Sequence, residues 1–384
     1  MTPPTPRLHA LDGLRGLAAV VVVLHHLSLL SPAVSNFYLH PELSPAPVGS
    51  LGWLLTATPI HLFVAGPEAV IVFFVISGVA LVLPVLRDPA FDWVAYYPQR
   101  VLRLLVPVAA SVLLAALWVV LTPQSPASAP TEWAAGASRS DLTLSPVISA
   151  VDVLFGDTSI NNPLWSLRWE LVFSLALPLM VVIGLATVGR LRGVATLAAC
   201  LAVVLLGGVL GLQSLVYLPV FVLGVLFAVR LEQTRQSIEM LPRARTLVIG
   251  AAVLLGSLAM LIAHVIVRAE LPGLPHLEQG ARALIPLGAL GLVICAVLWP
   301  PAAALLSSRL FRWLGRVSFS LYLVHVPIII AVSALVGRGS VVLGAAISLV
   351  VAVGVAELFS RVVEVPAHRW SKSVGARASA LLAR

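Results

Sequence analysis

Long apolar runs dominate the chain, and short polar segments separate them. A helix needs about 20 mainly apolar residues to cross a bilayer, and these runs have that length. We predict ten spanning helices, near residues 11–31, 66–86, 101–121, 163–185, 194–211, 213–231, 245–268, 282–299, 314–337 and 340–362. The pattern therefore predicts an all-α polytopic membrane protein with a single bundle of about ten transmembrane helices.

The polar segments between these runs predict the loops. Residues 32–65 and 122–162 are rich in Pro and Ser and are predicted to be external loops, the first partly re-entrant. Residues 232–244 are predicted to be the longest cytoplasmic loop. We expect one transmembrane domain over residues 1–370, followed by a basic cytoplasmic tail over residues 371–384, and a helix after Pro366 on the inner membrane surface.

Composition and charge support this interpretation. Hydrophobic residues make up 60% of the chain and charged residues 10%, which excludes an ordinary soluble protein. Of the 24 Lys and Arg residues, the predicted topology leaves five in external segments: Arg139, Arg168, Arg268, Arg282 and Arg338. Cationic residues concentrate on the cytoplasmic side of membrane proteins, so both termini are expected there. The net charge of +8 thus reports orientation in the lipid bilayer, and no nucleic-acid partner is expected.

Other compositional features narrow the setting. Cys200 and Cys295 both fall in apolar helices, so neither a disulfide nor a metal site is expected. A chain rich in Ala, Val, Leu and Arg with a single lysine, Lys372, indicates a GC-rich genome. We expect a multi-pass protein of a bacterial inner (plasma) membrane. The sequence leaves open whether it forms a homo-oligomer.

The first predicted helix carries polar groups that lipid disfavours. A charge at the centre of a spanning helix costs about 2.5–3.5 kcal/mol on insertion scales, so such residues are candidates for function. Arg15 and His26 lie eleven residues apart, about three helical turns, and share one face. His25 is rotated about 100° away from that face. Structural hydrogen bonds between helices would also explain these residues.

Further polar residues recur in the later helices. They are Ser77 beside Gly78, Ser166 and Glu170 four residues apart, and the stripe Ser318, Tyr322 and His325. We predict that they converge with His26 at one depth in the membrane. A carboxylate at the depth of Glu170 is expected to meet a donor or a cation, because an unpaired charge there is costly. Arg100 and Arg103, at a predicted cytoplasmic helix start, suit phosphate binding, although membrane anchoring would also place them there.

Six short motifs, in order along the chain, resemble those of the membrane-bound acyltransferase family 3. They are Arg15 and His26 with ten residues between them, "FFVISG" (73–78), Arg100 with Arg103, "WSLRWE" (165–170), "SFSLYLVH" (318–325) and "VVEVP" (362–366). The resemblance runs from about residue 8 to residue 370. One position departs from the family pattern: Ile71 stands where many members have aspartate, and Glu68 cannot be assumed to replace it.

The resemblance implies an integral membrane O-acyltransferase. Such an enzyme moves an acyl group, most commonly acetyl, from cytoplasmic acyl-CoA to a hydroxyl of a sugar, glycolipid, cell-envelope glycan or macrolide-type natural product. Acyl-CoA is then a donor substrate, and no permanently bound cofactor or metal is expected. The catalytic candidates are His26, Arg15, Glu170, Tyr322 and His325; the candidates for binding the donor are Arg15, Ser77, Arg100 and Arg103; and those for the acceptor are Ser166 and Glu170.

Acyl transfer to an alcohol needs a base and a stabilised oxyanion. His26 is the expected base, because neutral imidazole accepts protons near neutral pH. Tyr322, His325 or Ser77 are candidates for oxyanion donors. Direct attack by the acceptor and a covalent acyl-histidine or acyl-serine intermediate both remain open. The alternative function is a proton-coupled transporter of a small molecule, although the internal repeats and paired broken helices frequent in such carriers are not visible in the sequence.

Overall fold

The computed structural model describes residues 8–40, 43, 46–122, 124–271, 273–337 and 340–382, and every element within them is helical. In chain order the elements are α1 (His9–Ser28), α2 (Pro32–Leu39), α3 (Leu51–Ala57), η1 (Pro59–Val64), α4 (Gly66–Arg87), α5 (Trp93–Leu121), η2 (Pro126–Ser128), α6 (Glu132–Ala137), α7 (Leu144–Val151), η3 (Asn162–Leu164), α8 (Trp165–Leu175), α9 (Leu177–Ala186), α10 (Arg190–Leu210), α11 (Gln213–Glu239), α12 (Arg243–Glu270), α13 (Pro275–Arg282), α14 (Ile285–Leu298), α15 (Pro300–Leu306), α16 (Arg309–Val336), α17 (Val341–Phe359), the π-helical turn η5 (Ser360–Glu364) and α18 (Val365–Leu382).

The described part of the chain has nine helices long and apolar enough to cross a membrane, and a tenth span if the bent pair α8–α9 counts as one. Each of them falls on one of the ten predicted spans. The prediction of an all-α multi-pass membrane protein is therefore confirmed. The reason is physical, because a lipid-exposed backbone must satisfy its hydrogen bonds within each helix.

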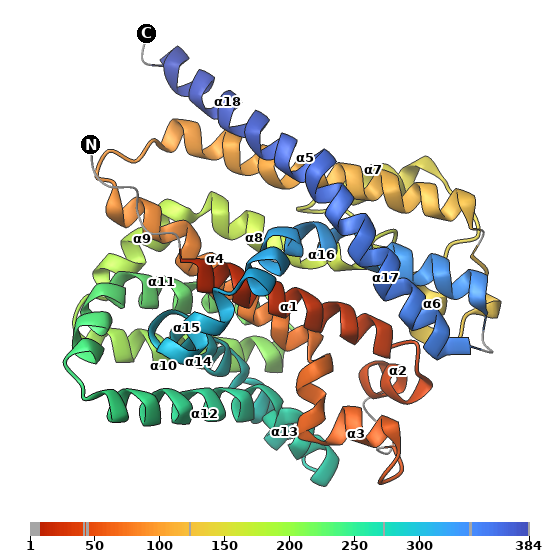
Figure 1. The fold of residues 1–384 in the computed structure, drawn as a ribbon, viewed down its shortest axis with the longest axis horizontal. Coiled ribbons are helices and arrows are strands. Elements are labelled where there is room, and N and C mark those ends of the chain that lie inside the picture. Colours follow the sequence, from red (N-terminus) through yellow and green to blue (C-terminus); the bar gives the residue numbers. More distant parts are fainter. Residues whose placement is uncertain are drawn as a thin grey trace.

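Two helices form the centre of the bundle. Figure 1 shows α1 crossing the middle of the molecule, with α5 and α18 toward one edge and α12 at the opposite edge. α1 packs along α16 and α4, and α16 packs in turn on α17 and α5. Close contact between α1 and α16 depends on glycine: a Cβ on Gly16 would come 2.5 Å from the backbone nitrogen of Gly315. This contact fixes how α1 and α16 present their polar residues to each other.

The span that carries Glu170 is broken, and a proline accounts for the break. α8 and α9 meet at an angle of 67°. Pro178 has no N–H to donate to the carbonyl of Ser174, so that carbonyl is freed at the bend. The hydroxyl of Tyr96 on α5 donates to it at 3.0 Å. α8 is thereby held against α5 at the bend.

The start of α5 differs from the prediction. The helix begins at Trp93, eight residues before the predicted start, because the Asp92 side chain caps it by accepting the N–H of Ala95 at 2.9 Å. α18 packs along α5, and a Cβ on Gly375 would lie 2.6 Å from the Ala95 carbonyl oxygen. Arg100 and Arg103 therefore lie about two and about three turns inside a helix. The expectation that they sit at a helix N-terminus is wrong.

Three predicted loops also contain more helix than expected. α11 extends to Glu239 and α12 begins at Arg243, so most of the predicted loop 232–244 is helical. The predicted external loop 122–162 contains η2, α6 and α7, and segment 46–65 forms α3 and η1, which pack on α12 and α1. Short caps and prolines, such as Ser50 before α3, start these helices without a long apolar run. Arg338, predicted to be external, lies outside the described residues.

Candidate active site

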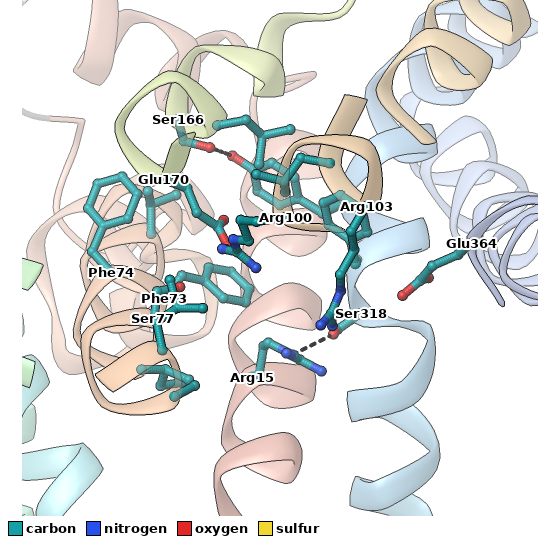
Figure 2. Close-up of a pocket in the computed structure, with 18 residues that line it drawn as sticks. Arg15, Phe73, Phe74, Ser77, Arg100, Arg103, Ser166, Glu170, Ser318 and Glu364 are labelled. Carbon is teal, nitrogen blue, oxygen red and sulfur yellow. Dashed lines mark hydrogen bonds and ion pairs between the residues drawn. The ribbon is translucent and has the colours of Figure 1, made fainter. Parts of the chain in front are cut away.

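A cavity of about 180 Å³ lies among α1, α4, α5, α8, α16 and η5. Its polar lining consists of Arg15, Ser77, Arg100, Arg103, Ser166, Glu170, Ser318, Tyr322 and Glu364, and its apolar lining includes Phe73, Phe74, Leu104 and Phe319. Seven of the nine predicted site residues therefore line one cavity (Figure 2). His26 and His325 do not line it. The prediction that these groups share one depth in the membrane is not tested by this structure, but the two histidines lie beside the cavity and not on its lining.

One side of the cavity holds an ion pair. Arg100 donates to the Glu170 carboxylate at 2.6 Å and to the Ser174 hydroxyl at 2.8 Å. The Arg100 and Glu170 side chains are only 10% and 24% exposed, so each charge depends on the other for compensation. The partner of Glu170 is thus an arginine, as the need for a donor or a cation predicted. Arg100 is largely occupied by this pair.

The opposite side of the cavity has two further arginines. Arg15 donates to the Ser318 hydroxyl and to the Gly315 carbonyl, both at 3.2 Å. Arg103 is exposed to the cavity and has no hydrogen bond or ion pair to any residue that the structure describes. Figure 2 shows Arg103 and Glu364 extending toward the region around Arg15. The Glu364 carboxylate accepts a hydrogen bond from Ser320 at 2.5 Å. Because Arg15 and Arg100 both donate to neighbouring residues, Arg103 is the cavity arginine most available to an anion.

The inner end of the cavity is closed by two hydroxyl groups. The Tyr322 hydroxyl lies 2.7 Å from that of Ser166, and it donates to the Pro163 carbonyl at 3.0 Å. Both side chains are buried, and Phe73 packs edge-on against the Tyr322 ring at 5.9 Å. On the other side of Tyr322, the His325 ring lies 5.9 Å away. Tyr322 thus separates the cavity from the histidines.

The two remaining predicted residues form a pair of imidazoles. His26 Nδ1 lies 2.9 Å from the Val22 carbonyl and 3.2 Å from Nε2 of His325. Because a carbonyl only accepts, His26 Nδ1 must carry the proton, and the neutral ring then has its lone pair on Nε2. His325 Nδ1 is fixed in the same way by the Leu321 carbonyl at 3.0 Å. The tautomer of His26 leaves Nε2 as the proton acceptor, and no residue that the structure describes occupies it.

The polar stripe on α16 therefore makes one contact per turn, alternating between α1 and α8. Ser318 meets α1 through Arg15, Tyr322 meets α8 through Ser166, and His325 meets α1 again through His26. The spacing of the stripe was visible in the sequence, but its partners were not.

Two other motif residues have a packing role. A Cβ on Gly78 would come 2.2 Å from the Phe221 carbonyl, so this glycine admits the backbone of α11 rather than a ligand. Glu68 is the acidic residue nearest Ile71, the position that differs from the family pattern. It lies outside the cavity and pairs with His264 at 3.1 Å, and both side chains are 3% exposed. His25 is also buried, with Nδ1 donating to the Val64 carbonyl at 3.0 Å. As predicted, His25 points away from the face of Arg15 and His26.

Sequence reasoning missed two features near the site. Ser174 fixes Arg100, and Trp133 of α6 lies with its ring centroid 5.6 Å from that of His26. Ser174 follows Glu170 by four residues, a spacing that places both on one face of α8. Trp133 offered no comparable signal, because the loop around it has no helical period.

Comparison with known proteins agrees with this geometry. A family model described as an acyltransferase domain, that of acyltransferase family 3, matches residues 8–361. The chain belongs to this family. This acyltransferase is also 26% identical over 377 residues to the O-acetyltransferase PaAT-1 of Phomopsis amygdali, an alignment covering 85% of this chain and 73% of that protein. No solved structure matches the acyltransferase. It is therefore a membrane O-acyltransferase, and the transporter alternative is set aside.

Proposed function

We propose that this acyltransferase transfers an acetyl group from acetyl-CoA to a hydroxyl of a carbohydrate or natural-product acceptor. The similarity to an O-acetyltransferase supports acetyl as the transferred group. The observation that carries the proposal is the arginine-lined cavity that ends at Tyr322, next to the histidine pair. Arginine forks bind phosphate oxygens through paired hydrogen bonds, which suits the phosphates of coenzyme A. Its thioester arm would then extend along the apolar wall toward Tyr322.

His26 is the proposed general base. The acceptor hydroxyl gives its proton to His26 Nε2 while its oxygen attacks the thioester carbonyl carbon. The carbon–sulfur bond then breaks, and the coenzyme A thiolate takes the proton back from His26, so that the products are the ester and free coenzyme A. His325 acts as a positioning residue, because its Nε2 accepts from His26 Nδ1–H. The reaction needs no net proton from solvent.

The oxyanion requires a donor at the junction between the cavity and the histidines. The Tyr322 and Ser166 hydroxyls are the polar groups at that end. Tyr322 donates to the Pro163 carbonyl. An acyl carbonyl oxygen entering this site would replace the Pro163 carbonyl as the acceptor of that hydrogen bond. The contact between η3 and Tyr322 would therefore have to open during the reaction.

Donor binding gives a direct test of this function. Purified protein in nanodiscs is expected to consume acetyl-CoA and release free thiol when a suitable acceptor is supplied. Arg103→Ala is expected to raise the KM for acetyl-CoA by roughly 10–100-fold, because hydrogen bonds to a charged group contribute about 1.5–3 kcal/mol. Arg103→Lys should fall between wild type and Arg103→Ala, since a point charge loses the paired geometry.

The matched control is Arg192→Ala, an exposed arginine at the start of α10 that does not line the cavity. It should leave the KM for acetyl-CoA unchanged. An equal KM in wild type and Arg103→Ala would show that the donor binds elsewhere.

The proposed site also implies a sidedness. We propose that both termini and the arginine-lined cavity face the cytoplasm of a bacterial cell, in keeping with the charge bias and with the location of acyl-CoA. Two exposed serines form a matched pair for labelling, Ser128 in η2 and Ser237 in α11. A membrane-impermeant maleimide should label Ser128→Cys in intact cells and Ser237→Cys only after permeabilisation. The reverse pattern would invert the orientation. Background labelling should be low, because Cys200 and Cys295 are buried.

A further inference from the structure

His26 is only partly buried. His325 is fully buried, whereas His26 keeps partial exposure, although neither histidine lines the donor cavity. His26 is therefore partly exposed outside that cavity. The element that faces His26 is α6, through the ring of Trp133.

α6 is firmly held over the end of α1. The Thr131 hydroxyl donates to the Leu29 carbonyl at 2.9 Å and accepts the N–H of Ala134 at 3.2 Å. The backbone N–H of Trp133 donates to the Ser35 hydroxyl at 3.4 Å. These contacts tie α6 to α1 and α2. The backbone hydrogen bonds of α6, and not only the Trp133 side chain, therefore hold Trp133 next to His26.

Trp133 and His26 each leave one polar group without a partner. The indole Nε1–H of Trp133 has no hydrogen bond to any described residue, and it is not among the fully buried polar atoms. The same holds for Nε2 of His26. One group is a donor and the other an acceptor, on rings whose centroids lie 5.6 Å apart at an interplanar angle of 46°. Trp, when it recognises a ligand, combines an apolar face with this single donor.

We propose that Trp133 and His26 form the acceptor subsite, and that it takes a hydroxylated ring compound. The apolar face of the acceptor ring would pack on the indole, and a ring or hydroxyl oxygen would accept from Nε1–H. The hydroxyl to be acetylated would donate to His26 Nε2. Few, well-placed polar groups beside an aromatic face are characteristic of small-molecule sites. A pyranoside and an alicyclic alcohol share this chemistry, whereas a straight-chain alcohol lacks the flat ring face.

This subsite places acceptor and donor on opposite sides of the catalytic residues. Arg15 precedes His26 by eleven residues on α1, roughly 16 Å along the helix axis. The phosphates of the donor would bind at the Arg15 end, and Trp133 lies at the other end. The inference rests on the proposed function, because it assigns the second substrate of the same reaction.

The test measures acetyl transfer to three probe alcohols: octyl β-glucoside, a cyclohexanol-type terpene alcohol, and 1-octanol. Wild type is expected to prefer the two ring alcohols, and the better of the two reports whether the site favours a sugar or an alicyclic ring. Trp133→Ala should raise the KM for that alcohol roughly tenfold or more, as truncation of a buried aromatic anchor does, and abolish the preference over 1-octanol. The KM for acetyl-CoA should not change. Trp133→Phe keeps a ring face without the N–H and should fall between the two.

The matched control is Trp370→Ala, an exposed tryptophan on α18 that does not line the cavity. It should keep the wild-type KM values, and all variants are compared at matched thermal stability. Wild-type transfer to ring alcohols with an unchanged acceptor KM in Trp133→Ala would overturn the subsite while leaving the proposed function intact. Equal rises in the KM values for acceptor and donor would also overturn it. Absence of thioester consumption by the wild type under every condition would instead contradict the proposed function.

Discussion

His26→Gln is expected to lower the rate of acyl transfer by roughly 10²–10⁴-fold, the usual contribution of a general base. In the wild type the Val22 carbonyl holds the proton on Nδ1, so Nε2 presents a lone pair to the acceptor hydroxyl. A glutamine amide retains hydrogen bonding but cannot take up and return a proton. The rate is measured with purified variants at saturating donor, and donor affinity should remain close to the wild-type value because His26 does not line the donor cavity.

His25 provides the matched control on the same helix. Its ring packs against Gly66, where a Cβ would come 2.5 Å from it, and it donates to the Val64 carbonyl. His25→Ala should therefore reduce thermal stability more than the rate per folded molecule. If His26→Gln remains active and His25→Ala is inactive at equal stability, the base has been assigned to the wrong face of α1.

Glu170→Gln is expected to destabilise the protein by about 3 kcal/mol, the low end of the range for breaking a buried ion pair, because the carboxylate keeps some exposure. The substitution leaves the Arg100 guanidinium without a counter-charge inside the bundle. The double variant Arg100→Leu/Glu170→Leu should recover much of that stability, because no unpaired charge remains. It should still lose acyl transfer, because the cavity then lacks one cation and one carboxylate.

The measurement is thermal unfolding in detergent for the single and double variants. Glu278→Gln serves as the comparison. Glu278, itself 18% exposed, forms a helical pair with Arg282, whose side chain is 50% exposed, so the arginine left without its partner is solvated. Such surface pairs contribute only about 0.2–1 kcal/mol. A loss of stability in Glu170→Gln no larger than in Glu278→Gln would mean that the Arg100–Glu170 pair is not a structural requirement.

The sequence was sufficient for the membrane spans and for the order of the motifs, and it was insufficient for their partners. Apolar length determines a span, so α4 was predicted within one residue at its C-terminal end. The Arg100–Glu170 pair joins residues 70 positions apart, and no local period relates them. The predicted start of α5 was wrong because Pro98 and the polar residues before it resemble a loop, although the Asp92 cap and the packing of α18 stabilise a helix there.

The separation of the histidines from the cavity was likewise not predictable. Arg15 and His26 share a face of α1, and that spacing suggested a single site. The ring of Tyr322 stands between the two groups, and its position depends on η3, a turn of three residues without a sequence signature. Trp133 was missed for a similar reason. A tryptophan in a predicted loop does not indicate a site, and its position beside His26 is known only from the placement of α6.

The three contacts of α16 also limit how this helix can change in length. Ser318, Tyr322 and His325 meet Arg15, Ser166 and His26 on one stripe, and each residue added to a helix turns everything after it by about 100°. A single insertion before Ser318 would therefore rotate the whole stripe away from its partners at once. An insertion of seven residues would nearly restore the angle but displace the stripe by roughly 10 Å along the axis. Substitutions can alter these contacts one at a time, whereas insertions and deletions in this segment remove them together. The number of residues between Gly315 and His325 is therefore itself a constraint on the enzyme.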